Sequence, residues 1–458
     1  MAKLSVVPFA VQEGATGIVQ NSSERLTNRD AEGTTSGRSR IVRRQRACLR
    51  SVYALTGEKR CIERHLGVHY LIVGGTLYSF NGTTLTTLAT LSTTSGRCTM
   101  AFNDNDQILI SDGQLLRYWN GTTLTTVGGT ASFTPGNVAY INGYGIVNSS
   151  GTGQFFSTTA DDFSAIDALD FATAESNPDA LQTVFVDHND IFLAGTSTIE
   201  VWQDTGGVDF PFQSIPSAKI ERGTAAPLSF AAEDNTVAFL GDDLIVYRLD
   251  AYRPTRISNH AVEEAIRGVS AAGRAAADAF VYTVSGHKFY TLTFPGELTV
   301  QYNYATGFWN RATTYGKDSW NVIGSAGRRS DYVLTDAGIC ELTPDLNQDE
   351  GADVVRTARS APGYAGGRLI TMQEFFADIM VGRTAIDVTA EVMLRVARDA
   401  ETFGNVRTRS LGAIGEYTTR PVWRGLGQGR RPVIELSASG NFNFAIMDTL
   451  LNATAANS

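Results

Sequence analysis

The sequence predicts an all-β protein: a six-bladed β-propeller with a small β-sandwich-like domain appended to it. Short apolar strands follow one another closely from residue 51, with glycine turns such as Asp112-Gly113 and Asn142-Gly143 between them. Asp-Gly and Asn-Gly favour the type I′ turns that join antiparallel strands. An eleven-residue segment also recurs at the spacing of one propeller blade.

We expect residues 1–50 to form an extended N-terminal arm. The arm has few apolar residues and carries a basic run from Arg38 to Arg46. Such a run can contact DNA or an acidic partner, or it can be a solvated strand or loop between subunits. The solvated strand or loop is the favoured interpretation.

The propeller is assigned to residues 51–345, and the repeat is the main evidence for it. Residues 77–87 recur as residues 116–126, with Asn81 and Asn120 at the same place, 39 residues apart (120 − 81). A four-stranded blade takes about 40 to 45 residues, so the offset matches one blade. A sandwich or an open meander is the alternative. In each copy, the aromatic residue before Asn-Gly should end one strand and the threonine-rich run after it should begin the next.

The remaining blades are expected to continue in the same way. A closed ring leaves few free sheet edges, which explains how so many strands are accommodated in one chain. The elements predicted with the clearest boundaries are a hairpin over 191–194 and 198–202 with its turn on Gly195, strands at 237–240 and 244–248, and a helix over 260–267.

The C-terminal part, residues 346–458, is expected to form the β-sandwich-like domain, which strands from the N-terminal arm can complete. Its alternating strands are predicted at 375–380, 388–397, 433–438 and 442–446. Acidic residues precede it, among them Asp345, Asp349 and Asp353. They lack the spacing of a calcium loop, so we expect a solvated loop there.

Composition limits the classes of function. The net charge of −9 repels nucleic acid, which argues against a protein that wraps DNA but is compatible with a conduit through which DNA slides. Charged residues make up only 19% of the chain, which suits wide contacts with other proteins. The four cysteines show no pairing pattern, and neither a signal peptide nor a membrane anchor is apparent. We expect free thiols and synthesis in a reducing cytoplasm.

No motif for catalysis is present, so we expect neither an enzyme nor a cofactor or metal. Nucleophile elbows, phosphate-binding loops and zinc-protease motifs are missing from the sequence. Cys61, His65 and His69 have the spacing of metal ligands on a helix, but His69 should open a strand, so the three should not converge.

One arginine cluster stands out near the C-terminus: Arg420, Arg424, Arg430 and Arg431 surround Trp423. These arginines can hold the carboxylates of a partner or touch DNA. They can equally form a structural network beside a buried tryptophan, and the sequence favours neither interpretation.

Four segments carry a resemblance to a known family. Residues 195–200 read G-T-S-T-I-E, residues 257–267 read I-S-N-H-A-V-E-E-A-I-R, residues 174–179 read A-E-S-N-P-D, and residues 422–431 read V-W-R-G-L-G-Q-G-R-R. Their patterns and order resemble the tail nozzle proteins of lambdoid short-tailed phages (podoviruses), also called packaged-DNA stabilisation proteins.

The resemblance implies a structural virion protein of the phage tail, made in the cytoplasm of the host bacterium. Such proteins form a hexameric tail nozzle or tail tube below the portal and adaptor ring proteins, retain packaged DNA and conduct it during ejection. The implied partners are further copies of the chain, the adaptor ring, a tail needle or plug, tailspike or fibre proteins, and DNA in the lumen. The alternatives are a carbohydrate- or receptor-binding propeller, in which aromatic residues stack on sugars, and a propeller hydrolase.

Overall fold

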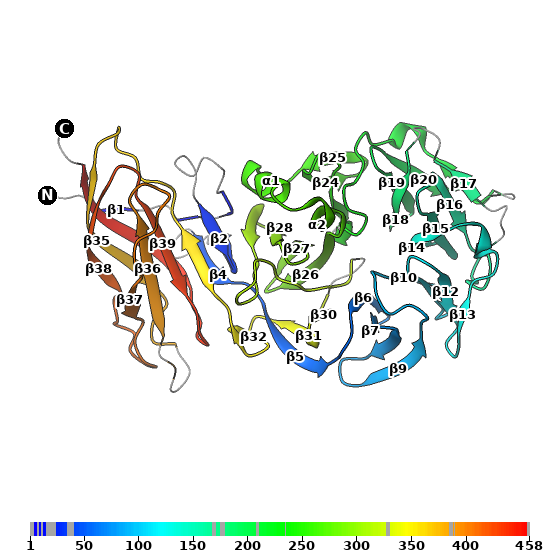
Figure 1. Cartoon of the computed structure of the whole chain (residues 1–458), viewed down its shortest axis with the longest axis horizontal. Coiled ribbons are helices and arrows are strands. Elements are labelled where there is room, and N and C mark those ends of the chain that lie inside the picture. The colour runs from blue at the N-terminus through cyan, green and yellow to red at the C-terminus, as the bar shows by residue number, and fades with distance from the viewer. Residues whose placement is uncertain are drawn as a thin grey trace.

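In the computed structural model the chain forms a ring of β-sheets joined to a layered β-domain, in which both termini lie (Figure 1). The structure describes residues 4–6, 9–10, 12–14, 24–33, 41–166, 171–174, 179–207, 210–233, 235–326, 330–383, 388 and 390–455.

Among the described residues, five four-stranded antiparallel sheets, four strands of a nine-stranded sheet and one three-stranded sheet surround the ring axis (Figure 1). In chain order they are β6 (Lys59–His65), β7 (Val68–Val73), β8 (Thr76–Phe80), β9 (Leu85–Thr90); β10 (Thr99–Phe102), β11 (Ile108–Ser111), β12 (Leu116–Trp119), β13 (Leu124–Thr126); β14 (Pro135–Ile141), β15 (Tyr144–Ser149), β16 (Gln154–Ser157), β17 (Phe171–Thr173); β18 (Leu181–Asp187), β19 (Asp190–Gly195), β20 (Ile199–Asp204), β21 (Phe212–Ser214); β22 (Ala231–Glu233), β23 (Thr236–Leu240), β24 (Val246–Asp250), β25 (Arg253–Arg256); β26 (Asp278–Val284), β27 (His287–Phe294), β28 (Leu298–Asn303), β29 (Phe308–Arg311); and β30 (Tyr332–Leu334), β31 (Gly338–Thr343), β5 (Cys48–Ala54).

The ring is a β-propeller, as predicted, but it has seven blades rather than the six we expected. A buried apolar cluster lies between each blade and the next, and the seventh blade packs on the first through Leu334, Ile339, Ile62 and Phe80. The seventh blade was missed because its outer strand, β5, comes from the start of the chain and pairs with β31. Burial of these clusters is the main force that closes the ring.

The repeated segment has the same structure in both copies. Asn81 follows β8 and Asn120 follows β12, and each side-chain oxygen accepts hydrogen bonds from the amides two and three residues further on, at 3.0 and 2.8 Å. The next strands begin at Leu85 and Leu124. This confirms the predicted strand ends and explains why Asn occurs at this position, since its side chain stabilises the turn.

The predicted helix is also confirmed. Helix α1 (His260–Arg267) begins after Asn259, whose side chain accepts a hydrogen bond from the amide of Val262 at 2.9 Å. A second short helix, α2 (Ala271–Ala275), and the 3-10 turns η1 (Thr130–Ser132) and η2 (Pro216–Ala218) are the other helical pieces in the described part of the chain. Helix α1 lies beside the fifth and sixth blades and buries Val262 and Ile266 against them.

The second part of the molecule consists of two sheets facing a common core. One sheet contains β3 (Arg29–Gly33), β4 (Ile41–Gln45), β40 (Ile446–Ala455), β35 (Ile370–Ile379) and β38 (Val422–Gly429), and β1 (Leu4–Val6) pairs with β40. The other contains β34 (Arg356–Arg359), β39 (Val433–Ala438), β36 (Glu391–Ala397) and β37 (Arg407–Ser410). Strands from the first 45 residues thus pair with strands from the last hundred. The boundaries at residues 50 and 345 stay a prediction.

A continuous sheet joins the two parts. Strand β2 (Arg25–Thr27) pairs with β29 of the sixth blade on one side and with β34 of the layered domain on the other. The sixth blade and the β34–β39–β36–β37 sheet therefore form one nine-stranded sheet. Backbone hydrogen bonds cross the joint, which restricts hinge motion between the two parts.

Buried arginines reinforce the joint. Arg46 is 3% exposed; its guanidinium faces the carboxylate of Asp349, on the short strand pair β32 (Gln348–Asp349) and β33 (Ala352–Asp353), with N–O distances of 2.5 and 3.2 Å. Arg43 donates to the carbonyls of Phe9 and Ala10 at 2.5 and 2.6 Å. The expectations of a solvated basic arm and a solvated acidic loop are wrong for these residues, because they are paired inside the protein. Residues 38–40 lie outside the described residues.

One predicted strand is misplaced. We expected a strand over 442–446, but β40 begins only at Ile446. Phe442 and Phe444 lie in an irregular segment, where the Arg356 guanidinium lies 4.8 Å from the ring centre of Phe442 and donates to the Phe442 carbonyl at 2.6 Å. Phe442 and Phe444 therefore pack in the hydrophobic core of the layered domain and do not belong to a strand.

Candidate functional site

Two of the segments that carry the family resemblance meet at the fourth blade. The Asp179 carboxylate accepts hydrogen bonds from the backbone amides of Thr196, Ser197 and Thr198 at 2.8, 2.8 and 2.9 Å, and from their hydroxyls. Partial burial raises the pKa of Asp179, but these hydrogen bonds outweigh it and hold the pKa below its ordinary value. Residues 175–178 of the same segment lie outside the described residues.

A third segment, residues 218–223, packs against the same turn. Ile199 and Ile220 exchange two backbone hydrogen bonds of 2.9 Å. A side chain at Gly195 would lie 2.4 Å from the Asp179 carboxylate, and one at Gly223 would lie 2.2 Å from the backbone of Thr196. Only glycine fits at these two places, so the three segments act together as the framework of the fourth and fifth blades.

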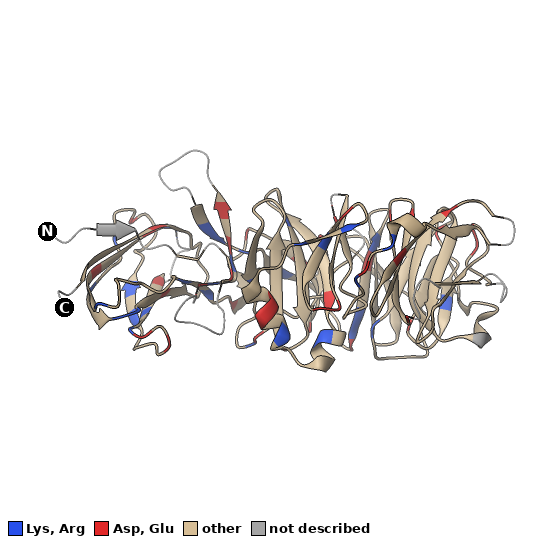
Figure 2. Cartoon of the chain, turned by 90° about the horizontal axis from the view of Figure 1, so that it is seen from above, with Lys and Arg blue, Asp and Glu red and all other residues tan. Residues whose placement is uncertain are grey.

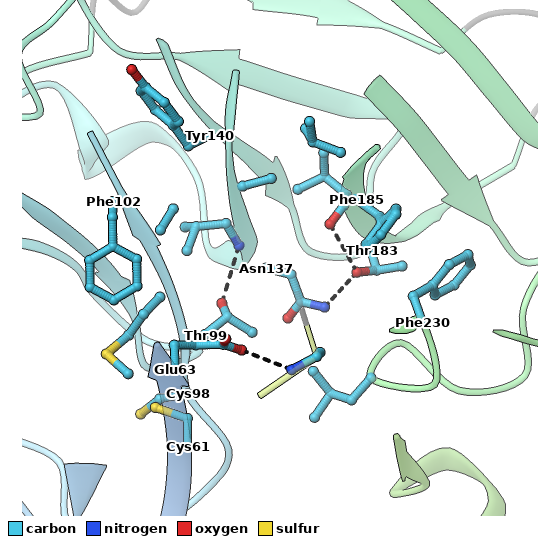
Figure 3. Close-up of a pocket in the computed structure, with 18 of the residues that line it drawn as sticks. Cys61, Glu63, Cys98, Thr99, Phe102, Asn137, Tyr140, Thr183, Phe185 and Phe230 are labelled. Atoms are coloured by element: carbon cyan, nitrogen blue, oxygen red, sulfur yellow. Dashed lines mark hydrogen bonds between the residues drawn. The ribbon is translucent and has the colours of Figure 1, made fainter. Parts of the chain in front are cut away.

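The ring axis holds a pocket of about 360 Å³ (Figure 3). The first strands of the first four blades, β6, β10, β14 and β18, supply most of its wall, and residues next to or in β22, β26 and β30 complete it. The polar lining residues used below are Glu63, Arg97, Thr99, Asn137, Thr183 and Asp278; the aromatic ones are Phe102, Tyr140, Phe185 and Phe230.

Hydrogen bonds tie neighbouring blades together around this pocket. Asn137 donates to the Thr183 hydroxyl at 2.6 Å, and the Thr99 hydroxyl accepts from the amide of Val138 at 3.1 Å (Figure 3). Glu63 accepts from the Ser325 hydroxyl and, at 3.3 Å, from the amide of Ala326. The pocket wall is thus held in place by hydrogen bonds between residues of different blades.

The ionisable groups of the pocket are shifted by burial. Burial raises the pKa of Glu63 to about 7 against the opposing effect of its hydrogen bonds, with a smaller contribution from the negative charge of Asp278. Burial also raises the pKa of Asp278, although Arg97 donates to it at 2.8 Å. Glu63 can therefore gain or lose a proton near neutral pH. Nothing in the sequence marked Glu63, Asp278 or Asn137, because these three residues come from different blades and lie far apart in the chain.

The predicted arginine cluster does not converge on a single site. Trp423 is fully buried in the core and donates to the Arg407 carbonyl at 2.8 Å. The exposed Arg424 pairs with Glu374 across the sheet at 3.2 Å, and Arg420 lies 4.0 Å from the ring centre of Phe376. Arg430 donates to the carbonyl of Gly367, and Arg431 is exposed. The role of the cluster as an interface or as a structural network stays a prediction.

Two arginines that the sequence did not single out cap the free edge of strand β38. Arg409 donates to the carbonyl of Val422 at 2.8 Å, and Arg407 donates to the carbonyls of Arg424 and Gly425 at 3.1 Å. Unpaired strand edges invite pairing with other chains, and charged side chains that occupy them prevent it. The only sequence clue was the alternation of arginine in residues 407–409.

The candidate metal ligands lie apart. His65 stacks on Phe102 with ring centres 4.7 Å apart, whereas His69 packs edge-on against Tyr332. Cys61 packs in the cluster between the first and second blades. In the described part of the chain, no group of three or more His, Cys, Asp or Glu residues is arranged to hold a metal ion.

A closed seven-bladed ring with a narrow polar axis, joined to a second β-domain, defines a β-propeller protein. The model of one protein family, described as bacteriophage P22 Gp10, beta-propeller, matches residues 20–341. The chain belongs to this family, which acts in the stabilisation of packaged DNA, and it is a phage structural protein.

The other comparisons add little. Three solved structures are similar: PorZ of Porphyromonas gingivalis (11% identity, 70% of this chain and 44% of that one, TM-score 0.38), a chain of the mitotic checkpoint complex (12%, 62% and 89%, 0.41), and the extracellular domain of BT4673 from B. thetaiotaomicron (10%, 90% and 62%, 0.42). The match thus spans less than half the length of PorZ. No curated protein sequence matches significantly. Among the described residues, no helix is long and apolar enough to cross a membrane.

Proposed function

We propose that the chain is the subunit of a hexameric tail nozzle, which extends the DNA exit channel of a short-tailed phage below the portal and adaptor rings. The nozzle retains packaged DNA and conducts it during ejection, without enzymatic turnover. Membership of the P22 Gp10 family supports the structural role. The structural observation that carries the proposal further is the narrow axis of the propeller.

DNA cannot pass through this propeller. The axial pocket of about 360 Å³ has the size of a site for a small ligand, whereas the major groove of a DNA duplex alone is about 12 Å wide. A duplex that this protein conducts must therefore pass between copies of the chain. Copies in head-to-tail contact close a ring around such a passage.

The distribution of charge supports a passage that does not grip DNA. Lysines and arginines alternate with acidic residues along the whole molecule instead of forming one basic face (Figure 2). Arg29, Arg43 and Arg46 are buried and bonded within the chain. Because affinity for DNA depends on the number of phosphates that cations neutralise, such a surface binds DNA weakly.

The proposed partners are the adaptor ring, a tail needle or plug, and tailspike or fibre proteins, in a tail assembled in the host cytoplasm. We offer the exposed Arg424 and Arg430 as contacts for carboxylates of a neighbouring subunit or partner. Their position on the layered domain, beyond the rim of the propeller, suits a contact between proteins.

Electron microscopy of the phage particle tests the proposal. We expect six-fold density of this fold below the portal, and particles without the protein should lose their DNA. The purified protein should sediment as a monomer or weak oligomer and assemble on the adaptor ring. A stable tetramer in solution, or particles that lack the protein yet keep their DNA, would contradict the proposal.

A further inference from the structure

The axial pocket contains buried polar atoms without partners. Asp278 is only 8% exposed; its Oδ1 accepts a hydrogen bond from Arg97 at 2.8 Å, but its Oδ2 has no partner among the described residues. Nε and Nη1 of Arg97 are also buried and unpartnered in the described part of the chain. A buried polar group without a hydrogen-bond partner destabilises the folded protein, so these atoms need a polar occupant.

The two ends of the pocket are lined by different residues. Because the first strands of the blades all run the same way along the axis, residues that start these strands lie at one end and residues that finish them at the other. Arg97 and Asp278 are at the starting end, and Arg97 also borders two further cavities of about 280 and 410 Å³. Tyr140 and the exposed Asp104 are at the finishing end.

The wall of the pocket combines polar and aromatic side chains. Thr99, Asn137 and Thr183 bring hydroxyl and amide groups, and Glu63 brings a carboxyl group (Figure 3). Phe102, Phe185 and Phe230 bring aromatic surface. A volume of about 360 Å³ with aromatic walls and a few fixed polar groups is typical of sites for small organic ligands, which span ~300–1,000 Å³.

We propose that the axial pocket binds one neutral sugar unit, with its hydroxyl groups on Arg97 and Asp278 and its apolar ring surface against the aromatic wall. This proposal goes beyond the role as a tail component. Each sugar hydroxyl has one donor and two acceptor sites. Two adjacent hydroxyls can therefore donate to Oδ2 of Asp278 and accept from Nε and Nη1 of Arg97, which satisfies all three atoms.

Charge distinguishes a neutral sugar from other ligands. The carboxyl groups of Glu63 and Asp278 repel an anion when they are ionised, and the guanidinium of Arg97 already neutralises Asp278, which reduces the attraction of that carboxylate for a second cation. A neutral ligand with many hydroxyls meets neither penalty. Water is the simpler occupant, and the experiment must separate the two.

Calorimetric titration and saturation-transfer NMR of the full-length protein with glucose, galactose and N-acetylglucosamine test the proposal. We expect saturable binding of at least one of them, with a dissociation constant on the order of 1 mM. Galacturonate should bind at least about tenfold more weakly than galactose because of its charge, if galactose is the sugar bound. If a methyl glycoside binds as tightly as the free sugar, the bound sugar unit is the end of a glycan chain. If only the free sugar binds, the ligand is a free monosaccharide. Both outcomes support the site.

The matched variants are Asp278→Asn and Asp318→Asn. Asp278→Asn keeps the shape of the side chain and an oxygen that accepts from Arg97, but it replaces the charged acceptor of the sugar hydroxyl. The affinity for the sugar should therefore fall at least about tenfold. Asp318→Asn removes the same charge from an exposed position outside the pocket and should leave affinity unchanged. Circular dichroism shows whether each variant is folded. No saturable binding of any neutral sugar by the wild-type protein, or equal affinity of the two variants, would overturn the proposal.

Discussion

Thr196 donates two hydrogen bonds to Asp179, one from its backbone amide at 2.8 Å and one from its hydroxyl. The two residues belong to separate segments, and both segments match the family pattern for a structural reason. Asp179 stands before the first strand of the fourth blade, and Thr196 stands in the turn between the second and third strands. Their contact fixes that turn against the entrance of its own blade.

Replacing Asp179 with alanine should destabilise the protein by about 2–3 kcal/mol, because three backbone amides lose a charged acceptor. Since the pKa of Asp179 is lowered in the folded protein, its contribution is present at neutral pH and is lost as pH falls through the acidic range. Urea unfolding at pH 7 and at pH values well below 3.8, the ordinary pKa of the group, measures both effects. Asn81→Ala, which removes a similar but uncharged turn acceptor, should cost about 1 kcal/mol. Equal losses for the two variants would contradict the assignment.

Glu63 should make stability depend on pH near neutrality. The pKa of Glu63 is about 7 in the folded protein and near 4.5 in the unfolded chain. Between pH 4.5 and pH 7, the folded state therefore binds more protons than the unfolded state. Stability must therefore fall as pH rises through this window, by up to roughly 3 kcal/mol. Glu63→Gln should remove this slope and be more stable than the wild type at pH 8. Thermal melts of both proteins between pH 5 and pH 8 measure the difference; parallel curves would refute the shifted pKa.

The buried pair of Arg46 and Asp349 should matter far more than a surface pair. Asp349→Ala leaves a buried guanidinium without its carboxylate, which should cost about 3–5 kcal/mol. The control is Glu341→Ala, which breaks the exposed pair with Arg50 and should cost less than about 1 kcal/mol. Chemical denaturation gives both values. A loss below 1 kcal/mol for Asp349→Ala would mean that the joint does not depend on this pair.

Gly338 should be essential for closing the ring. It has a φ of +148°, and an added Cβ would lie 2.0 Å from the carbonyl oxygen of Tyr53 on the closing strand β5. Gly338→Ala should therefore release β5 and lower stability by more than about 3 kcal/mol. Gly316→Ala, also at positive φ but with open space around it, should cost only about 1 kcal/mol. Hydrogen exchange of β5 residues reports the release, and protection equal to that of the wild type would contradict it.

Arg407 and Arg409 should protect the edge of β38. The double variant Arg407→Ala/Arg409→Ala exposes carbonyls that these side chains cap, so it should aggregate several-fold faster than the wild type on mild heating. Arg424→Ala removes a charge from the same strand but leaves the caps in place. Light scattering compares the three proteins at equal concentration. If Arg424→Ala aggregated as fast as the double variant, net charge rather than edge capping would be the cause.

The elements that the sequence predicted correctly are those that depend on residues close together along the chain. The turns at Asn81 and Asn120, the hairpin at Gly195 and helix α1 all follow from residues within a few positions of one another. The seventh blade could not be predicted, because β5 and β31 are almost three hundred residues apart and neither carries a repeat. Strand β2 was missed for the same reason, since it is three residues long and its partners are remote.

In the candidate site, too, groups close together in sequence were predicted and groups from distant parts of the chain were not. The arginine cluster was visible because its members are close in sequence, but alternate residues of a strand point to opposite faces, so Trp423 enters the core while Arg424 points to solvent. The axial pocket was invisible because its polar groups come from several blades. Position in space, not spacing in sequence, brings Arg97 to Asp278.

The pairing of β1 with β40 and of β5 with β31 also limits when these sheets can form during synthesis. At about 5 to 20 residues per second, β31 is made roughly 15 to 60 seconds after β5, and β40 roughly 20 to 90 seconds after β1. A polypeptide that ends before β31 cannot close its final blade, and one that ends before β40 lacks a central strand of the layered domain. Only finished molecules can thus present the mature shape to the growing particle, so the topology itself screens out incomplete products.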